Sequence, residues 1–152
     1  MVIRFLLRPV LVGAVCLVAI LGAVGAGTDQ LAAVDPSVRI VVPCGIWQDG
    51  DQYGSTRVVV YALGWEHVRS FVIAQWLLHD DASQTVSLLK SAPVKELNEG
   101  SWVTVDSVHF TRAGDAGVVE IAYRQRDDEK PKSIRLQLSH PGVYNIVGQS
   151  KR

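Results

Sequence analysis

Apolar residues along the chain fall into short runs, most with a period of two, between segments rich in Gly, Pro, Asp and Ser. The most apolar run outside the N-terminus spans residues 57–81. Its first part carries Val58, Val59, Val60 and Tyr61 and ends at Gly64, a pattern that predicts a strand buried on both faces.

Residues 65–78 are long enough for a helix, so the positions of their apolar residues are compared with the periods of a helix and of a strand. At 100° per residue the polar side chains do not gather on one side, because Ile73, Ala74 and Leu77 fall among them. At 180° per residue Val72, Ala74 and Trp76 share one dry face. We predict a long strand, with a bend or bulge near Ser70 that divides it between two sheets. A buried helix is the alternative.

The remaining segments are short and separated by turn residues. We predict further strands over residues 38–42, 84–91, 101–111, 118–126, 134–138 and 143–147, with one turn of helix over 93–98 and an exposed glycine-rich loop over 45–55. Residues 127–132 are predicted to form a charged turn. On the strand over 101–111, strict alternation places Trp102, Val108 and Phe110 opposite Val103 and Val105. The fold predicted is an all-β antiparallel β-sandwich, immunoglobulin-like or barrel-like, with about eight strands in a single domain over residues 38–148.

The N-terminal segment predicts targeting rather than fold. Arg4 and Arg8 precede an uncharged apolar run, and Val24, Gly25 and Ala26 are small residues suited to a signal peptidase. We expect a signal peptide over residues 1–26, cleaved after Ala26, and a flexible leader over 27–37. The alternative is an uncleaved anchor, since residues 9–26 are just long enough to span a bilayer.

Charge and cysteine content narrow the function. The chain has 15 basic and 15 acidic residues, so its overall charge does not favour nucleic acid as a partner. Cys16 lies in the signal segment, which leaves Cys44 without an intramolecular disulfide partner, and we expect the fold not to need it. Neither Asn98 nor Asn145 starts an N-glycosylation site, which favours a bacterial envelope.

The residues that could carry chemistry form no compact motif. His67 and His79 with Asp80 are weak metal-site candidates that would need the fold to bring them together. Residues 49–54 resemble the start of a calcium loop, but Tyr53 and Val60 stand where carboxylates should be. The chain has neither a nucleophile elbow nor a nucleotide-binding fingerprint, so we expect no cofactor, and nothing argues for an enzyme.

Aromatic residues give the clearest binding candidates. Trp47 and Tyr53, with Asp49 and Asp51, occupy the glycine-rich segment and could form a partner surface, although Trp47 could instead fold back onto the core. We therefore expect a periplasmic or secreted, non-enzymatic binding or accessory protein of the bacterial cell envelope, with a protein partner. Two alternatives stay open. One is a small extracytoplasmic hydrolase or metal-dependent enzyme that uses His67 and His79; the other is a single-pass membrane-anchored domain of an envelope assembly, which contacts the membrane only if residues 1–26 are retained.

Overall fold

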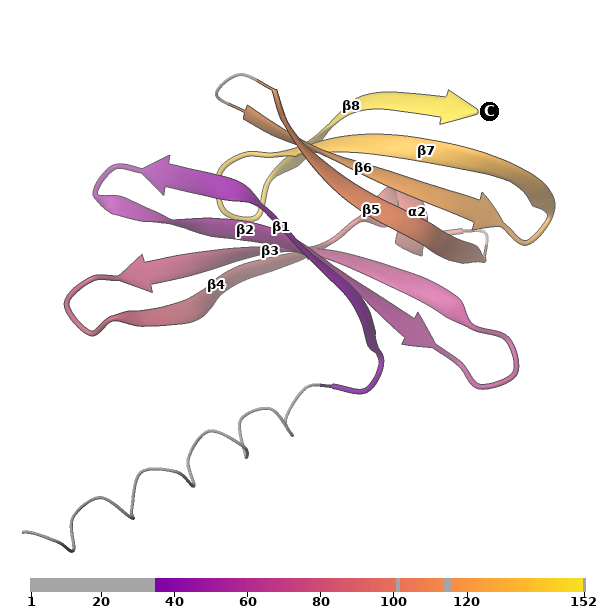
Figure 1. The fold of residues 1–152 in the computed structure, drawn as a ribbon, viewed down its shortest axis with the longest axis horizontal. Coiled ribbons are helices and arrows are strands. Elements are labelled where there is room, and N and C mark those ends of the chain that lie inside the picture. Colours follow the sequence, from indigo (N-terminus) through magenta and orange to yellow (C-terminus); the bar gives the residue numbers. More distant parts are fainter. Residues whose placement is uncertain (1–34, 101, 114–115, 152) are drawn as a thin grey trace, which may run out of the picture. The chain divides into compact units, whose positions relative to one another are not determined.

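The fold is an antiparallel β-sandwich made of two four-stranded sheets (Figure 1). The computed structural model describes residues 35–152 apart from 101, 114–115 and 152, so the signal segment and most of the leader lie outside the described residues. The first sheet contains β1 (Val38–Asp49), β2 (Gln52–Leu63), β3 (Arg69–Asp80) and β4 (Thr85–Pro93). The second contains β5 (Val103–Ala113), β6 (Ala116–Gln125), β7 (Asp128–Leu138) and β8 (Tyr144–Lys151).

The strand order in each sheet follows the sequence, so the chain forms two successive meanders. This confirms the predicted sandwich, without the Greek-key crossover that immunoglobulin domains contain. The short helix α2 (Lys95–Asn98) connects the sheets. The Asn98 side chain bonds both the N–H and the carbonyl of Val72, at 2.8 and 2.7 Å, and so extends the pairing of β3 where β4 has ended. Within the described part of the chain, no helix is long and apolar enough to cross a membrane.

The core lies between the sheets and uses the inward positions of both. Val58, Val60 and Val72 of the first sheet are buried against residues of the second, including Ile121, Ile134 and Leu136. A neighbouring cluster is built on Trp76, which is fully buried and donates its indole N–H to the Ser139 carbonyl across the sandwich at 3.1 Å. Val119 and Ile121 of β6 and Ile134 and Leu136 of β7 are all buried, which confirms the alternation predicted for these two strands.

The predicted exposed loop over 45–55 is wrong. β1 continues through Pro43 to Asp49, and only Gly50 and Asp51 separate it from β2. A register shift between Pro43 and Ile46, with Gly45 at φ +110°, lets the strand continue and returns Trp47 to the core.

Gly54 explains how this hairpin closes. The Trp47 indole N–H donates to the Leu77 carbonyl at 3.1 Å, and it passes over Gly54 to do so. A Cβ on Gly54 would lie 1.7 Å from that carbonyl oxygen, so only glycine fits. The glycine at position 54 is therefore needed for close packing of two strands and an indole, and it does not mark an exposed loop.

The prediction of a bend near Ser70 is also wrong, as is the helical alternative. β3 pairs with β2 without interruption from Gly54 opposite Leu78 to Leu63 opposite Arg69. The strand begins later than expected because Gly64, at φ +100°, turns residues 64–68 into a loop. Ser70 is an inward residue whose hydroxyl accepts a 2.9 Å hydrogen bond from the Val105 N–H, which connects the two sheets.

The expected alternation of β5 fails at one position. The register shifts between Val105 and Ser107, which is a bulge at Asp106. The bulge inverts the parity, so that Val103, Val105, Val108 and Phe110 all contribute to the core, where strict alternation had separated them. Two boundaries also differ: β7 already begins at Asp128, inside the predicted charged turn, and β8 continues to Lys151.

The outer faces of the two sheets carry different side chains. On the first sheet, two rows that are mainly apolar cross the strands: row one is Val41, Val59, Ile73 and Pro93, and row two is Ile46, Leu77 and Leu88 with the polar Ser55 among them. A polar row lies between them, formed by Pro43, Arg57, Gln75 and Ser91. The outer face of the second sheet is polar, with Thr104, Asp106, His109, Glu120, Arg124, Ser133, Arg135 and Gln137.

Candidate functional site

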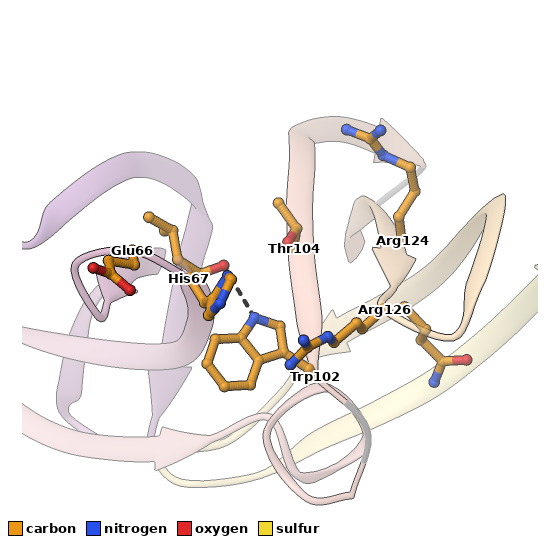
Figure 2. Close-up of a pocket in the computed structure, with 8 residues that line it drawn as sticks. Glu66, His67, Trp102, Thr104, Arg124 and Arg126 are labelled. Atoms are coloured by element: carbon orange, nitrogen blue, oxygen red, sulfur yellow. Dashed lines mark hydrogen bonds between the residues drawn. The ribbon is translucent and has the colours of Figure 1, made fainter.

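An open groove of about 580 Å³ lies where the loop between β2 and β3 meets the second sheet (Figure 2). The loop contributes Glu66, His67 and Val68; β5 and β6 contribute Thr104, Arg124 and Gln125; and Trp102 and Arg126 lie directly before β5 and directly after β6. Their spacing in the sequence predicted no contact between any two of these side chains. They come together because the sandwich places one end of β3 beside the ends of β5 and β6.

Trp102 is the centre of the groove, and hydrogen bonds hold it in place. Its indole N–H donates to the Val68 carbonyl at 3.1 Å, and its own carbonyl accepts from the Arg126 N–H at 2.9 Å. The His67 ring stands edge-on to the indole, with centroids 6.4 Å apart, and the Arg126 guanidinium lies 5.7 Å from the indole centroid (Figure 2). The arrangement offers a fixed aromatic surface with cationic and hydrogen-bonding groups beside it.

Arg124 forms the rim of the groove on the side of the second sheet. Its guanidinium makes a bidentate ion pair with Asp106, with contacts between 2.6 and 3.1 Å. Asp106 is the bulge residue of β5, so the irregularity in that strand also positions the rim. Arg124 is therefore oriented by the sheet, while Arg126 faces the indole (Figure 2).

Trp65 stands at the tip of the loop that borders the groove. Its side chain is 97% exposed, although the residues that follow it, Glu66 to Val68, line the groove. Gly64 allows this loop, because a Cβ there would lie 2.5 Å from the His67 carbonyl oxygen. Sequence reasoning placed Trp65 and Trp102 within strands and so missed both. The signal was the glycine directly before Trp65, which ends the strand early.

The predicted partner-binding residues lie at the opposite end of the first sheet. Trp47 is only 6% exposed and packs in the core, as its alternative interpretation foresaw. Tyr53 is exposed and donates its hydroxyl to Asp81, and this hydrogen bond raises the pKa of Tyr53. Asp49 and Asp51 flank the turn between β1 and β2. A binding role for Tyr53, Asp49 and Asp51 stays a prediction.

The metal-site candidates are not brought together. His67 lies in the loop before β3 and His79 near the far end of that strand, and the strand residues between them span roughly 33 Å at about 3.3 Å per residue. The His79 ring contacts Ser55 Oγ at 3.0 Å, and Asp80 accepts hydrogen bonds from Ala82 and Ser83 in the following turn. Among the described residues, no group of three or more His, Cys, Asp and Glu could hold a metal ion.

Cys44 belongs to the core, and the expectation that the fold does not need it stays a prediction. The thiol is 4% exposed and donates to the Val42 carbonyl at 2.9 Å. Burial raises the pKa of Cys44 to about 11. The thiol is therefore neutral at physiological pH and poorly suited to act as a nucleophile. Its contribution is to packing.

No protein-family model, curated protein or solved structure matches this chain.

Proposed function

We propose that the protein is an exported, non-enzymatic binding or accessory protein of the bacterial cell envelope, and that it holds a protein partner at the Trp102 groove. The observation that carries this proposal is Trp65, a 97% exposed indole on the loop whose following residues line the groove. Exposed aromatic anchors beside a rigid pocket are typical of binding hot spots, because they bury a large area at little cost in side-chain entropy.

The chemistry of the groove supports binding. Trp102 supplies a flat apolar surface, Arg126 and His67 supply donors around it, and Glu66 supplies an acceptor. These groups suit a partner that presents an apolar or aromatic side chain flanked by polar groups. The envelope location rests on the sequence of residues 1–26 and on the missing glycosylation acceptors. If residues 1–26 are retained, the same groove belongs to a membrane-anchored domain. The intact mass of the protein from its native host distinguishes the retained form from the form cleaved after Ala26.

Photo-crosslinking in intact cells tests the proposal. A photoreactive phenylalanine analogue in place of Trp65 should yield a discrete heterologous adduct. The same probe at Val143, which is 48% exposed but outside the groove, is the matched control and should yield none. Arg126→Ala should weaken the adduct strongly, since loss of an interface anchor typically costs about 2 kcal/mol, or roughly thirtyfold in affinity. An adduct that persists unchanged in Arg126→Ala, or equal adducts at both probe positions, would contradict the assignment.

A further inference from the structure

A second groove, of about 540 Å³, lies at the opposite end of β5 from the Trp102 groove. One wall is formed by five consecutive residues of β1, residues 44–48. The other wall is the end of β7 and the turn that follows it, residues 137–140. Phe110, Arg112 and Gly117, near the turn between β5 and β6, complete the lining. We call this cavity the β1 groove, and it shares no lining residue with the Trp102 groove.

The β1 groove runs along the free edge of β1. Successive side chains of a strand point to opposite faces, so a cavity lined by five consecutive residues lies beside the strand and not over one face. Within the described sheets, β1 is hydrogen-bonded only to β2. Along such an edge, alternate residues direct their N–H and carbonyl groups away from the sheet. This wall of the groove can therefore pair with an added strand.

The length of edge available for pairing is short. Pro43 has no N–H, and the register shift between Pro43 and Ile46, with Gly45 at φ +110°, interrupts the strand just before the groove. β1 ends at Asp49. Residues 46–49 therefore remain for pairing, which is roughly 13 Å of strand at about 3.3 Å per residue. A segment bound there depends on its side chains for much of its affinity and specificity.

The apolar part of the lining is closely packed. Phe110 lies against two glycines: a Cβ on Gly117 would be 2.1 Å from the Phe110 ring, and a Cβ on Gly45 would be 3.5 Å from it. Trp47 is buried, and Leu138 is partly buried against both core clusters. These residues therefore offer a preformed apolar surface to a side chain of an incoming segment.

The charge of the lining favours an acidic segment. Among the described residues, Arg112 supplies a permanent positive charge to the β1 groove and no carboxylate lines it. The Arg112 side chain is exposed and makes no hydrogen bond or ion pair with another residue of the described chain. Its guanidinium N–H groups are therefore available for the bidentate binding of a carboxylate.

We propose that the β1 groove binds an extended segment of another protein, which adds to residues 46–49 as a short strand and carries one apolar and one acidic side chain. Side chains two positions apart in an extended segment point to the same side. The apolar side chain contacts Phe110 and Leu138, and the carboxylate binds Arg112. The free backbone groups of β1 favour a polypeptide over a small anion, because only a polypeptide pairs with them along the strand. This site is independent of the partner proposed for the Trp102 groove.

Fluorescence anisotropy on the full chain, as purified from its host, tests the proposal with labelled, amidated heptapeptides. The peptides consist of threonine with one apolar residue (Leu, Ile, Val or Phe) and one Glu two positions before or after it. At least one should bind with a Kd of about 100 µM or below, and Gln in place of its Glu should raise the Kd about tenfold. Arg112→Gln should raise the Kd of the Glu peptide equally and leave the Gln peptide unchanged. Arg135→Gln removes an exposed arginine on the outer face of the second sheet and, as the matched control, should leave the Kd within about threefold of the parent.

Methylation of the peptide nitrogen atoms distinguishes strand addition from binding by side chains alone. Only alternate N–H groups of the peptide face β1, so methylation of one alternate set should raise the Kd about tenfold and methylation of the other set should have little effect. The proposal would be overturned by a lack of binding at about 1 mM, by equal binding of the Glu and Gln peptides, by an unchanged Kd in Arg112→Gln, or by equal effects of the two methylated sets. Loss of binding in Arg126→Ala would also overturn it, because the peptide would then occupy the Trp102 groove. Circular dichroism of every variant confirms that the fold is intact.

Discussion

The second strand of each sheet shows how differently the two outer faces are built. The outer positions of β2 are Ser55, Arg57, Val59 and Tyr61, and those of β6 are Val118, Glu120, Ala122 and Arg124. Val59 is only 3% exposed and lies between Val41 and Ile73 in its row. Glu120 instead lies opposite His109 and Arg135. The outer face of the first sheet thus has an apolar residue with almost no exposure to water at its centre, whereas the second sheet has charged residues there.

The strongest test of this difference is one substitution at equivalent places. Val59→Asp should lower the free energy of unfolding by at least about 3 kcal/mol, because it places an unpaired charge where almost no water reaches. Val118→Asp, on the polar face, should cost no more than about 1 kcal/mol. Urea denaturation at low protein concentration measures both. Similar losses for the two variants would mean that the faces do not differ energetically.

A second pair of variants compares the space around one glycine in each sheet, Gly54 in the first and Gly148 in the second. Gly54→Ala should cost about 2–3 kcal/mol, since the new Cβ meets the Leu77 carbonyl at 1.7 Å and displaces the Trp47 hydrogen bond. Gly148→Ala should cost less than about 1 kcal/mol, because its nearest contact is the flexible end of Arg135, at 2.7 Å. Thermal melting checks both values. Near-ultraviolet circular dichroism should change only for Gly54→Ala, which disturbs an indole.

The smallest expected effect is a pH dependence of stability caused by Cys44, which is buried between the two sheets. Because the pKa of Cys44 is raised from 9.0 to about 11 in the folded chain, its stabilising contribution is complete below pH 9 and is lost as the pH rises through 11. Between these values the parent should lose about 2 kcal/mol more than Cys44→Ala. Urea titrations of both proteins at pH 8, 9, 10 and 11 measure the difference. Parallel curves would show that the thiol ionises without opposing the fold.

The periods of the strands were sufficient to predict the sandwich and its core. Val119, Ile121, Ile134 and Leu136 alternate strictly with polar residues, and all four are buried. The predictions failed where a local irregularity changes the parity, as at Asp106, or where glycine permits close packing, as at Gly54. In both places the outcome depends on a partner strand or side chain that is distant in the sequence.

The groove could not be predicted from the sequence, because its residues also meet only through contacts between distant parts of the chain. His67 and Trp102 are brought together by the packing of two sheets, and neither belongs to a motif with fixed spacing. Composition favoured Trp47 as a recognition residue, but its indole is buried, whereas recognition by Trp65 is the proposal made above. The choice between Trp47 and Trp65 is made by Gly54 and Gly64, which respectively allow an indole to pack inward and a loop to project outward.

The meander order of the strands has a consequence for how the chain folds. Every hydrogen-bonded strand pair joins neighbours in the sequence, so each sheet can form through short loop closures. Joining the sheets is the non-local step, since contacts such as Trp76 to Ser139 span 63 residues. As the ribosome delivers the N-terminal half first, β1 to β4 can pair while β5 to β8 are still missing. During that interval the inner face of the first sheet is uncovered and its outer face carries two largely apolar rows, which makes this sheet prone to aggregation and a part of the chain that a chaperone would have to protect.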